Sequence, residues 1–402
     1  MANFETGSVS SSSMVDFNNT EIAFAHKSDH ELKRTAWLFR MMNKQWLVNV
    51  GSKASMLFNS TGIGIFNPII RATIFKQFCG GISLKDSEET IEHLHQLHTY
   101  SVLDFGAEAK SCDEDFDEVL EENIKAIRFA STHAGIPVIS SKITALGAFE
   151  ILEKFQTKQG LNAEEQKAFE RIEKRVDKLC QVAAEHKIAI FFDAEETWIQ
   201  DTIDLLVKKM MEKYNQERVV AYHTFQLYRK DKLQSLKDDF EEAKSKGYIL
   251  GAKIVRGAYM EKERKRAASM GYPSPIQETK DDTDRDYNAA LSFLVDHYEE
   301  IASCNASHNQ KSNLLQAQWI VERGIPRDHK HLNFCQLLGM SDNITFNLAK
   351  AGFNVAKYVV YGPVKDVVPY LIRRARENSS VTGEMSRELS LILTEIKRRG
   401  LK

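Results

Sequence analysis

The strongest constraint on the fold is a regular alternation, from residue 100 onwards, between short apolar runs and long charged segments. Several of the runs are apolar on both faces, as strands of a parallel sheet buried between two layers must be. The segments between them, such as 113–135 and 161–187, have the composition and length of helices. Eight strand–helix units predict an α/β fold, a (β/α)8 barrel of the TIM type. A doubly wound open sheet is the main alternative, but it usually carries a G-x-G-x-x-G turn after its first strand, which LDFGAEAK lacks. The eight runs are TYSVLDFG, IPVISSKITAL, IAIFFDAEE, VVAYHTFQLY, YILGAKIVRGAY, IASCNASHN, HLNFCQLLGM and VAKYVVYGPV.

The part of the chain before the first run differs in character. Residues 1–20 are rich in Ser, Asn and Gly and are predicted to be mobile. Residues 21–98 have apolar positions at the spacing of helices. The predicted organisation is therefore a mobile N-terminus (1–20), an α-helical N-terminal region (21–98) and a barrel (99–402).

Composition and motifs exclude several classes of protein. A formal net charge of -2 argues against bulk binding of nucleic acid. No run reaches the roughly 18 apolar residues that a membrane span needs, although a peripheral membrane contact stays open. The first 25 residues contain three acidic side chains and no Arg, unlike a secretory signal or a mitochondrial transit peptide. The five cysteines have no C-x-x-C spacing, so no metal site is predicted. We therefore expect a cytoplasmic protein, with a peripheral position at the inner face of the inner membrane left open.

Polar and charged residues gather where the predicted strands end. In a barrel all these ends point to one face, which is where barrel enzymes build their active sites. Helix caps account for some of the acids. They do not account for Lys142, Lys253 and Arg256, because a partly buried cation requires a partner or an anionic ligand. The residues at strand ends are Asp104, Glu108, Lys142, Asp193, Glu195, Glu196, Gln226, Lys253, Arg256, His308 and Asn309.

A face of the barrel that carries several cations and no metal ligands suits an anionic substrate or a phosphate-bearing cofactor. A cation beside a flavin stabilises the reduced, anionic ring and so favours uptake of a hydride. Two other classes remain open from the residues alone. One is an aldolase-type barrel with Lys142 or Lys253 as a Schiff-base nucleophile. The other is a non-enzymatic binding barrel, which has no reason to collect charged residues at one mouth.

Six motifs, in order along residues 100–381, resemble those of the proline dehydrogenase family. They are KITAL, FFDAEE, AKIVRGAY, ASHNQKS, LLGM and YLIRRARENSSV. The resemblance implies a stand-alone flavoprotein barrel that oxidises L-proline to Δ1-pyrroline-5-carboxylate. It further implies FAD as the cofactor, hydride transfer from C5 of proline to N5 of FAD, and a quinone as the electron acceptor. A hydroxyproline dehydrogenase on the same scaffold is the alternative within this chemistry.

The last motif contains the residues that the resemblance assigns to the substrate carboxylate. Tyr370 is three and four residues before Arg373 and Arg374, so all three share one helix face. A guanidinium binds a carboxylate through two charge-assisted hydrogen bonds. By resemblance, these arginines and Lys142 hold the carboxylate while Tyr370 packs on the proline ring. The resemblance also implies ring contacts from Tyr259 and Leu337, hydrogen bonds within the site from Asp193, and an entrance gate that includes Glu108.

The flavin-binding residues implied by the resemblance lie on the later strand ends, in a Thr-Asp pair at 283–284 and on the arginine helix. They are Gln226, Lys253, Arg256, Thr283, His308 and Glu377. A separate pyrroline-5-carboxylate dehydrogenase is the metabolic partner that this chemistry implies.

Overall fold

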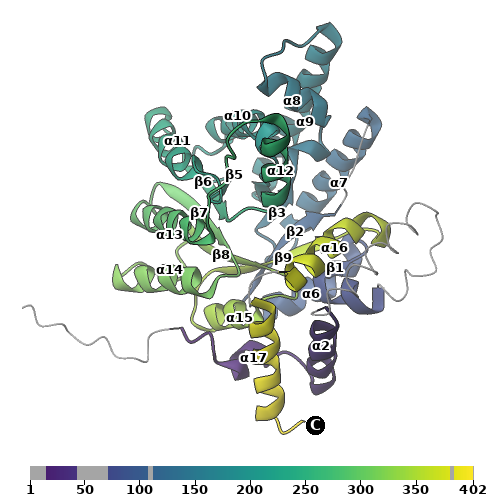
Figure 1. Cartoon of the computed structure of the whole chain (residues 1–402), viewed down its shortest axis with the longest axis vertical. Coiled ribbons are helices and arrows are strands. Elements are labelled where there is room, and N and C mark those ends of the chain that lie inside the picture. The colour runs from purple at the N-terminus through teal and green to yellow at the C-terminus, as the bar shows by residue number, and fades with distance from the viewer. Residues whose placement is uncertain (1–14, 43–70, 107–111, 381–383, 402) are drawn as a thin grey trace, which may run out of the picture.

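Eight parallel strands, β2 to β9, close into a barrel in the computed structural model (Figure 1). The structure describes residues 15–42, 71–106, 112–380 and 384–401. Each predicted run contains one barrel strand, so the (β/α)8 prediction is confirmed. Consecutive strands pair in parallel from β2 to β9, and β9 pairs with both β8 and β2 to close the barrel. The strands are β2 (Tyr100–Phe105), β3 (Val138–Ser141), β4 (Ala189–Phe192), β5 (Ala221–Gln226), β6 (Leu250–Val255), β7 (Ile301–Ala306), β8 (Leu332–Leu337) and β9 (Val355–Tyr361).

Successive strand residues face alternately outwards, toward the helices, and inwards, into the barrel. Ile139 and Ile190 belong to the apolar layer between strands and helices. Phe191, Cys304 and Tyr358 belong to the apolar cluster that fills the barrel interior. All residues of β3, β4 and β5 are buried, which is why these strands lack the polar alternation of a half-exposed sheet.

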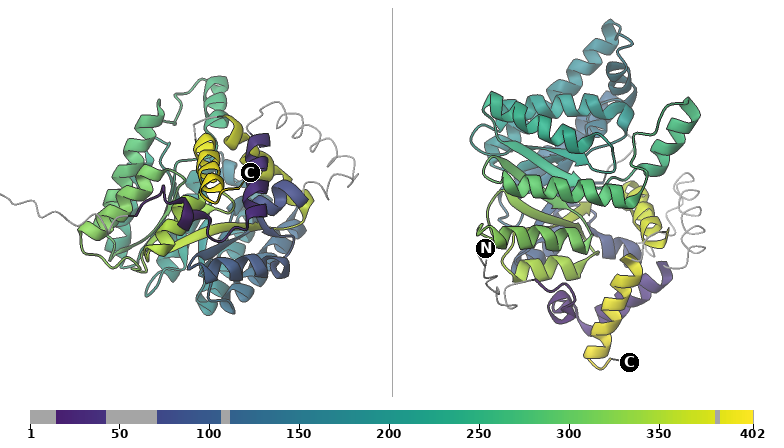
Figure 2. Two further views of the ribbon diagram at one scale, coloured as in Figure 1. Left: turned by 90° about the horizontal axis from the view of Figure 1, so that it is seen from below. Right: turned by 60° about the vertical axis from the view of Figure 1, so that its left-hand side comes forward.

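Helices surround this barrel and pack on its outer face (Figures 1 and 2). The longest, α9, begins with a capping box between Asn162 and Glu165 and ends at Lys187 in a left-handed conformation. The helices of the barrel region are α7 (Asp113–Ser131), α8 (Phe149–Gln156), α9 (Ala163–His186), α10 (Thr197–Tyr214), α11 (Lys232–Lys246), α12 (Met260–Met270), α13 (Lys280–Asp296), α14 (Gln310–Glu322), α15 (Asp342–Lys350), α16 (Val364–Ser380) and α17 (Glu384–Arg398).

The described part of the N-terminal region forms several helical segments and one short strand, which the sequence does not predict. The helices are α1 (Thr20–Phe24), α2 (Asp29–Met42), the π-helical turn η3 (Arg71–Phe75), α5 (Lys76–Phe78) and α6 (Leu84–Gln96). The short strand β1 (Cys79–Gly81) pairs with the end of β9. Glycine disfavours strands, but a Cβ on Gly80 would lie 2.4 Å from Val359 Cγ1. The strand therefore depends on a close tertiary approach that local propensity does not reveal. Residues 1–14 lie outside the described residues, whereas Phe17 is buried and its carbonyl accepts a hydrogen bond from Asn343.

The helices before the first barrel strand and after the last one differ in where they pack. The helix that precedes the first barrel strand, α6, packs against β1, β2 and β9. The helix that follows the last strand, α16, instead contacts η3, α2 and α17 and lies across the barrel in Figure 1. The Tyr370–Arg374 segment of α16 is thereby brought to the carboxyl ends of the strands. Among the described residues, no helix combines the length and the apolar character that crossing a membrane requires.

Candidate active site

An ion pair between Asp193 and Lys253 lies in the barrel near the strand ends. Lys253, from β6, is 4% exposed and donates to Asp193 Oδ1. Its ammonium group also lies 5.2 Å from the ring centroid of Phe191 and 5.5 Å from that of Tyr358. Burial alone would raise the pKa of the Asp193 carboxyl, but Lys253, Lys142 and the Tyr358 hydroxyl hold that pKa below its ordinary value. Asp193 is therefore ionised at neutral pH.

Two further side chains bind the same carboxylate and were missed by the sequence analysis. Ser140 Oγ donates to Asp193 Oδ1 at 3.1 Å, and the Tyr358 hydroxyl donates to Oδ2 at 2.9 Å. Tyr358 and Ser140 also contact each other through their hydroxyl groups. The sequence does contain a signal for Tyr358. Successive residues of a strand point to opposite faces of the sheet, so Tyr358 in VAKYVVY faces the other side of the barrel wall from Lys357.

Arg256 is held rigidly at the end of β6. Its guanidinium binds Asp284 Oδ1 at 2.7 Å through Nε, Ser307 Oγ at 2.7 Å and Ser312 Oγ at 3.0 Å. It also lies 4.2 Å from the ring centroid of Tyr287. A planar group with five donors can satisfy such a set of contacts, and a lysine cannot. Arg256 thus has a fixed orientation before any ligand arrives.

Gln226 and His308 complete the strand-end groups on this side of the barrel. Gln226 Oε1 is buried and has no hydrogen-bond partner among the described residues. Burial, and then the charges of Lys357 and Arg374, lower the pKa of His308 to about 3, so its imidazole is neutral. A buried amide oxygen without a partner is uncommon and offers an acceptor to a ligand. Together with Lys253 and Arg256, this set fits a polar, anionic cofactor such as a flavin nucleotide.

The arginine helix α16 meets β2 and β3 at a narrow cavity. Lys142, Ser140, Tyr370 and Arg373 all line it. The guanidinium of Arg374 lies 5.3 Å from the ring centroid of Tyr370. The cavity has a volume of about 30 Å³. Side chains from α16 and from the ends of β2 and β3 therefore face one another across a small space.

Tyr259 and Glu195 lie within electrostatic reach of this cavity. Burial raises the pKa of the Tyr259 hydroxyl, and the charges of Lys142 and Arg373 oppose that rise. Burial also raises the pKa of Glu195 to about 7, against the opposing effects of Lys142 and Thr144. Glu195 accepts hydrogen bonds from Thr144 N at 3.2 Å and Thr144 Oγ1 at 2.5 Å. Its carboxyl is thus partly protonated near neutral pH, which its place at a strand end did not indicate.

Two of the remaining predicted site residues, Leu337 and Thr283, lie in the part of the chain that the structure describes. Leu337 is the last residue of β8 and is half-buried, and its N–H donates to His308 Nε2 at 3.5 Å. Thr283 is buried in the first turn of α13, and its hydroxyl donates to Thr279 O at 3.3 Å. Glu108 and the side chain of Glu377 lie outside the described residues.

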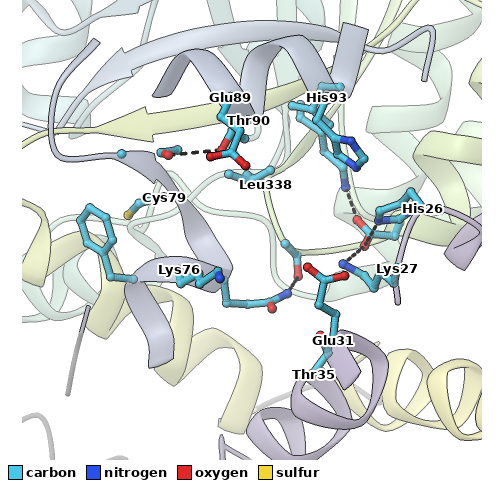
Figure 3. A pocket seen from close by; sticks show the side chains of 18 of the residues that line it. His26, Lys27, Glu31, Thr35, Lys76, Cys79, Glu89, Thr90, His93 and Leu338 are labelled. Atoms are coloured by element: carbon cyan, nitrogen blue, oxygen red, sulfur yellow. Dashed lines mark hydrogen bonds and ion pairs between the residues drawn. The ribbon is translucent and has the colours of Figure 1, made fainter. Parts of the chain in front are cut away.

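A much larger cavity, of about 910 Å³, lies elsewhere and contains none of the predicted site residues. Figure 3 shows its position between α2, α6 and the segment that carries Lys76 and Cys79. Its charged groups pair with one another: Asp342 binds Lys27 at 3.2 Å and Lys357 at 2.9 Å. Its size alone does not make it the candidate active site, because barrel enzymes build their active sites at the strand ends.

Comparison with known proteins identifies the family. The sequence model of the family described as "Proline dehydrogenase" matches residues 87–387. Proline dehydrogenase 1, mitochondrial, of Dictyostelium discoideum is 32% identical over 95% of this chain and 74% of its own length. The hydroxyproline dehydrogenase of Xenopus laevis is 30% identical over 94% of this chain and 88% of its own length. Among solved structures, proline utilization A of Bdellovibrio bacteriovorus superposes with a TM-score of 0.71 and 18% identity, over 89% of this chain and 38% of that protein, which supports the barrel fold. The chain therefore belongs to the proline dehydrogenase family, oxidoreductases that act on proline and are in general flavoproteins.

Proposed function

We propose that this chain catalyses the flavin-dependent oxidation of L-proline to Δ1-pyrroline-5-carboxylate. The observation that carries the proposal is the cavity between α16 and the strand ends, because Lys142 and Arg373 line it together. Two cations from distant parts of the sequence suit a substrate carboxylate. Ser140 lines the same cavity and donates to Asp193, so the cavity adjoins the Asp193–Lys253 pair.

In this proposal the chain's own residues bind and orient the substrate. Lys142, Arg373 and Arg374 hold the carboxylate, and Tyr370, Tyr259 and Leu337 contact the ring. Glu108 forms part of the entrance gate. Fixing the substrate at near-attack distance from the acceptor is the main contribution of the protein to the rate. The cations also lower the pKa of the substrate amine, because a second positive charge is disfavoured beside them. The neutral amine is the form whose nitrogen lone pair stabilises the developing iminium.

We propose FAD as the cofactor. Gln226, Lys253, Arg256 and His308 would hold it, with Thr283 and Glu377 as further contacts. The support is the acceptor of Gln226 without a partner and the fixed cation of Arg256. When bound, the flavin accepts the hydride that proline loses. A quinone as the final acceptor, a separate pyrroline-5-carboxylate dehydrogenase as the enzyme that consumes the product, and a cytoplasmic site with a peripheral membrane contact complete the proposal.

A second candidate is hydroxyproline dehydrogenase, which the similarity to the Xenopus protein favours. The visible absorption spectrum of the purified protein, recorded before and after anaerobic addition of each amino acid, separates the two. Bleaching of an oxidised flavin band by L-proline, with a higher kcat/KM than for trans-4-hydroxyproline, supports the main proposal. Bleaching by hydroxyproline alone supports the second. A protein that binds no FAD contradicts both and points back to Schiff-base chemistry, which borohydride trapping would reveal.

A further inference from the structure

Ser341 has a backbone conformation that is costly for its residue type. Its φ of 52° and ψ of 41° are left-handed, a region that non-glycine residues enter only with backbone strain. The described residues contain three other non-glycine residues with positive φ, His98, Lys158 and Lys187, and all three are exposed. Ser341 is 3% exposed. A buried serine where glycine would be free of strain indicates that its hydroxyl group has a role.

The hydroxyl of Ser341 contacts His308, one of the proposed flavin-binding residues. Ser341 Oγ lies 2.9 Å from His308 Nδ1. Since the Leu337 N–H donates to His308 Nε2, the proton of the neutral ring lies on Nδ1, and Ser341 Oγ accepts it. The backbone N–H of Ser341 in turn donates to Glu388 Oε1 of α17 at 2.5 Å. The chain Glu388–Ser341–His308 therefore links the C-terminal helix to the barrel mouth.

The loop that carries Ser341 is fixed on both sides. Gln77 Nε2 donates to Gly339 O at 2.9 Å, and Lys357 Nζ donates to Met340 O. Asp342, the next residue, is paired with Lys357 and Lys27. Contacts from the N-terminal region, from β9 and from α17 thus over-determine the loop. Such a loop can keep a strained residue in place and can give the side chain on it a defined direction.

We propose that Ser341, held by Glu388, is a positioning residue for the cofactor: its hydroxyl fixes the orientation and tautomer of His308 at the flavin site. The inference rests on the proposed function, in which His308 contacts FAD. Without the hydroxyl, the Nδ1–H of His308 loses its acceptor, and the ring is free to rotate or to move its proton to Nε2. Loss of one such hydrogen bond predicts a 5- to 10-fold weaker binding of FAD, from roughly 1 kcal/mol for a typical bond.

Two substitutions at Ser341 separate the hydroxyl from the backbone strain. Ser341→Gly removes both, and Ser341→Ala removes only the hydroxyl. We expect both variants to bind FAD 5- to 10-fold more weakly in titrations of the apoprotein followed by flavin fluorescence. Only Ser341→Ala should lower the melting temperature of the apoprotein. Lys158→Gly is the matched control, because it relieves the same strain at an exposed site and should leave the affinity for FAD unchanged.

Substitutions of Glu388 test the second link. Glu388→Ala should weaken FAD binding, whereas Glu388→Gln, which keeps an acceptor oxygen, should restore most of the affinity. A Ser341→Gly variant that binds FAD as the wild type does would overturn the proposal, as would a loss of affinity that follows melting temperature across the variants. A wild-type chain that binds no FAD would instead overturn the proposed function on which the inference rests.

Discussion

The Asp193–Lys253 pair should be essential to the fold as well as to the site. Asp193 accepts from Lys253, from Ser140 and from Tyr358, and Lys253 is almost completely buried. Replacement of one partner of a buried pair costs ~3–5 kcal/mol, because the other charge stays buried without compensation. The rings of Phe191 and Tyr358 beside the ammonium offset about 1–2 kcal/mol of that cost. Asp193→Asn should therefore destabilise the protein by about 3 kcal/mol.

The double variant Asp193→Asn/Lys253→Met tests whether the uncompensated charge is the cause. Methionine has an apolar stem of similar length, so the double variant should recover about 2 kcal/mol relative to Asp193→Asn alone. Urea unfolding of the apoprotein, followed by tryptophan fluorescence, measures the difference. Glu164→Gln is the control, because its pair with Lys167 is exposed and should contribute nothing measurable.

Both Asp193 variants should lose activity with proline, so activity alone does not test this account. A loss below about 1 kcal/mol for Asp193→Asn would refute the reasoning that a buried charge is left unpaired. So would a double variant no more stable than the single one. The same comparison at about pH 3 and pH 7 adds a check on sign, because the contribution falls away only below the ordinary pKa of an aspartate, ~3.9. The folded-state pKa of Asp193 is depressed, so its contribution is present above the unfolded pKa and is lost as pH falls through the folded one.

Four further predictions follow from the site. Because burial raises the pKa of Glu195 to about 7, its contribution to the free energy of unfolding is full below its unfolded pKa and is lost as pH rises through 7. Glu195→Gln should therefore remove about 3 kcal/mol of the pH dependence of that free energy between pH 4 and pH 9. Unfolding curves whose pH dependence matches that of the wild type would contradict this. Arg256→Lys should weaken FAD binding at least 10-fold, since lysine cannot bind Asp284, Ser307 and Ser312 together, and equal cofactor retention after gel filtration would argue against it. Arg373→Gln should raise KM for proline about 10- to 100-fold with a smaller change in kcat, whereas an unchanged KM would remove this arginine from the carboxylate site. Turnover of proline should rise with pH and then level, because the amine must be neutral; a constant rate from about pH 6 to 9 would exclude this account.

The order and type of the barrel elements are readable from the sequence because they depend on local patterns. Parallel strands buried on both faces leave continuous apolar runs, and the charged helices between them leave a 3.6-residue period. Strand-end chemistry is also readable, since every strand of a barrel ends at the same face. In the structure Lys142, Asp193, Gln226, Arg256 and His308 lie at or just after the ends of their strands, and Lys253 lies two residues before the end of β6.

The features that the sequence does not reveal all depend on contacts between distant segments. Strand β1 has glycine at position 80 because its backbone there lies so close to Val359 that a Cβ would be 2.4 Å from Cγ1. Tyr358 and Ser140 join Asp193 only when three strands meet. The strain at Ser341 and its contact with Glu388 come from a loop fixed by three separate elements.

By itself, therefore, the sequence determined the barrel, its element order and the residues at its mouth, since periodicity and strand-end position are properties of neighbouring residues. Only the tertiary structure decided which of those residues pair, and it did so through burial. Burial makes the Asp193 carboxylate require Lys253, keeps His308 neutral and raises the pKa of Glu195. It also brings α16 across the strand ends, so that Arg373 lines one cavity with Lys142, 231 positions earlier in the chain. The folded chain excludes water from these groups, and this exclusion sets their pKa values and the strength of their ion pairs. No local sequence pattern encodes which groups lose their water.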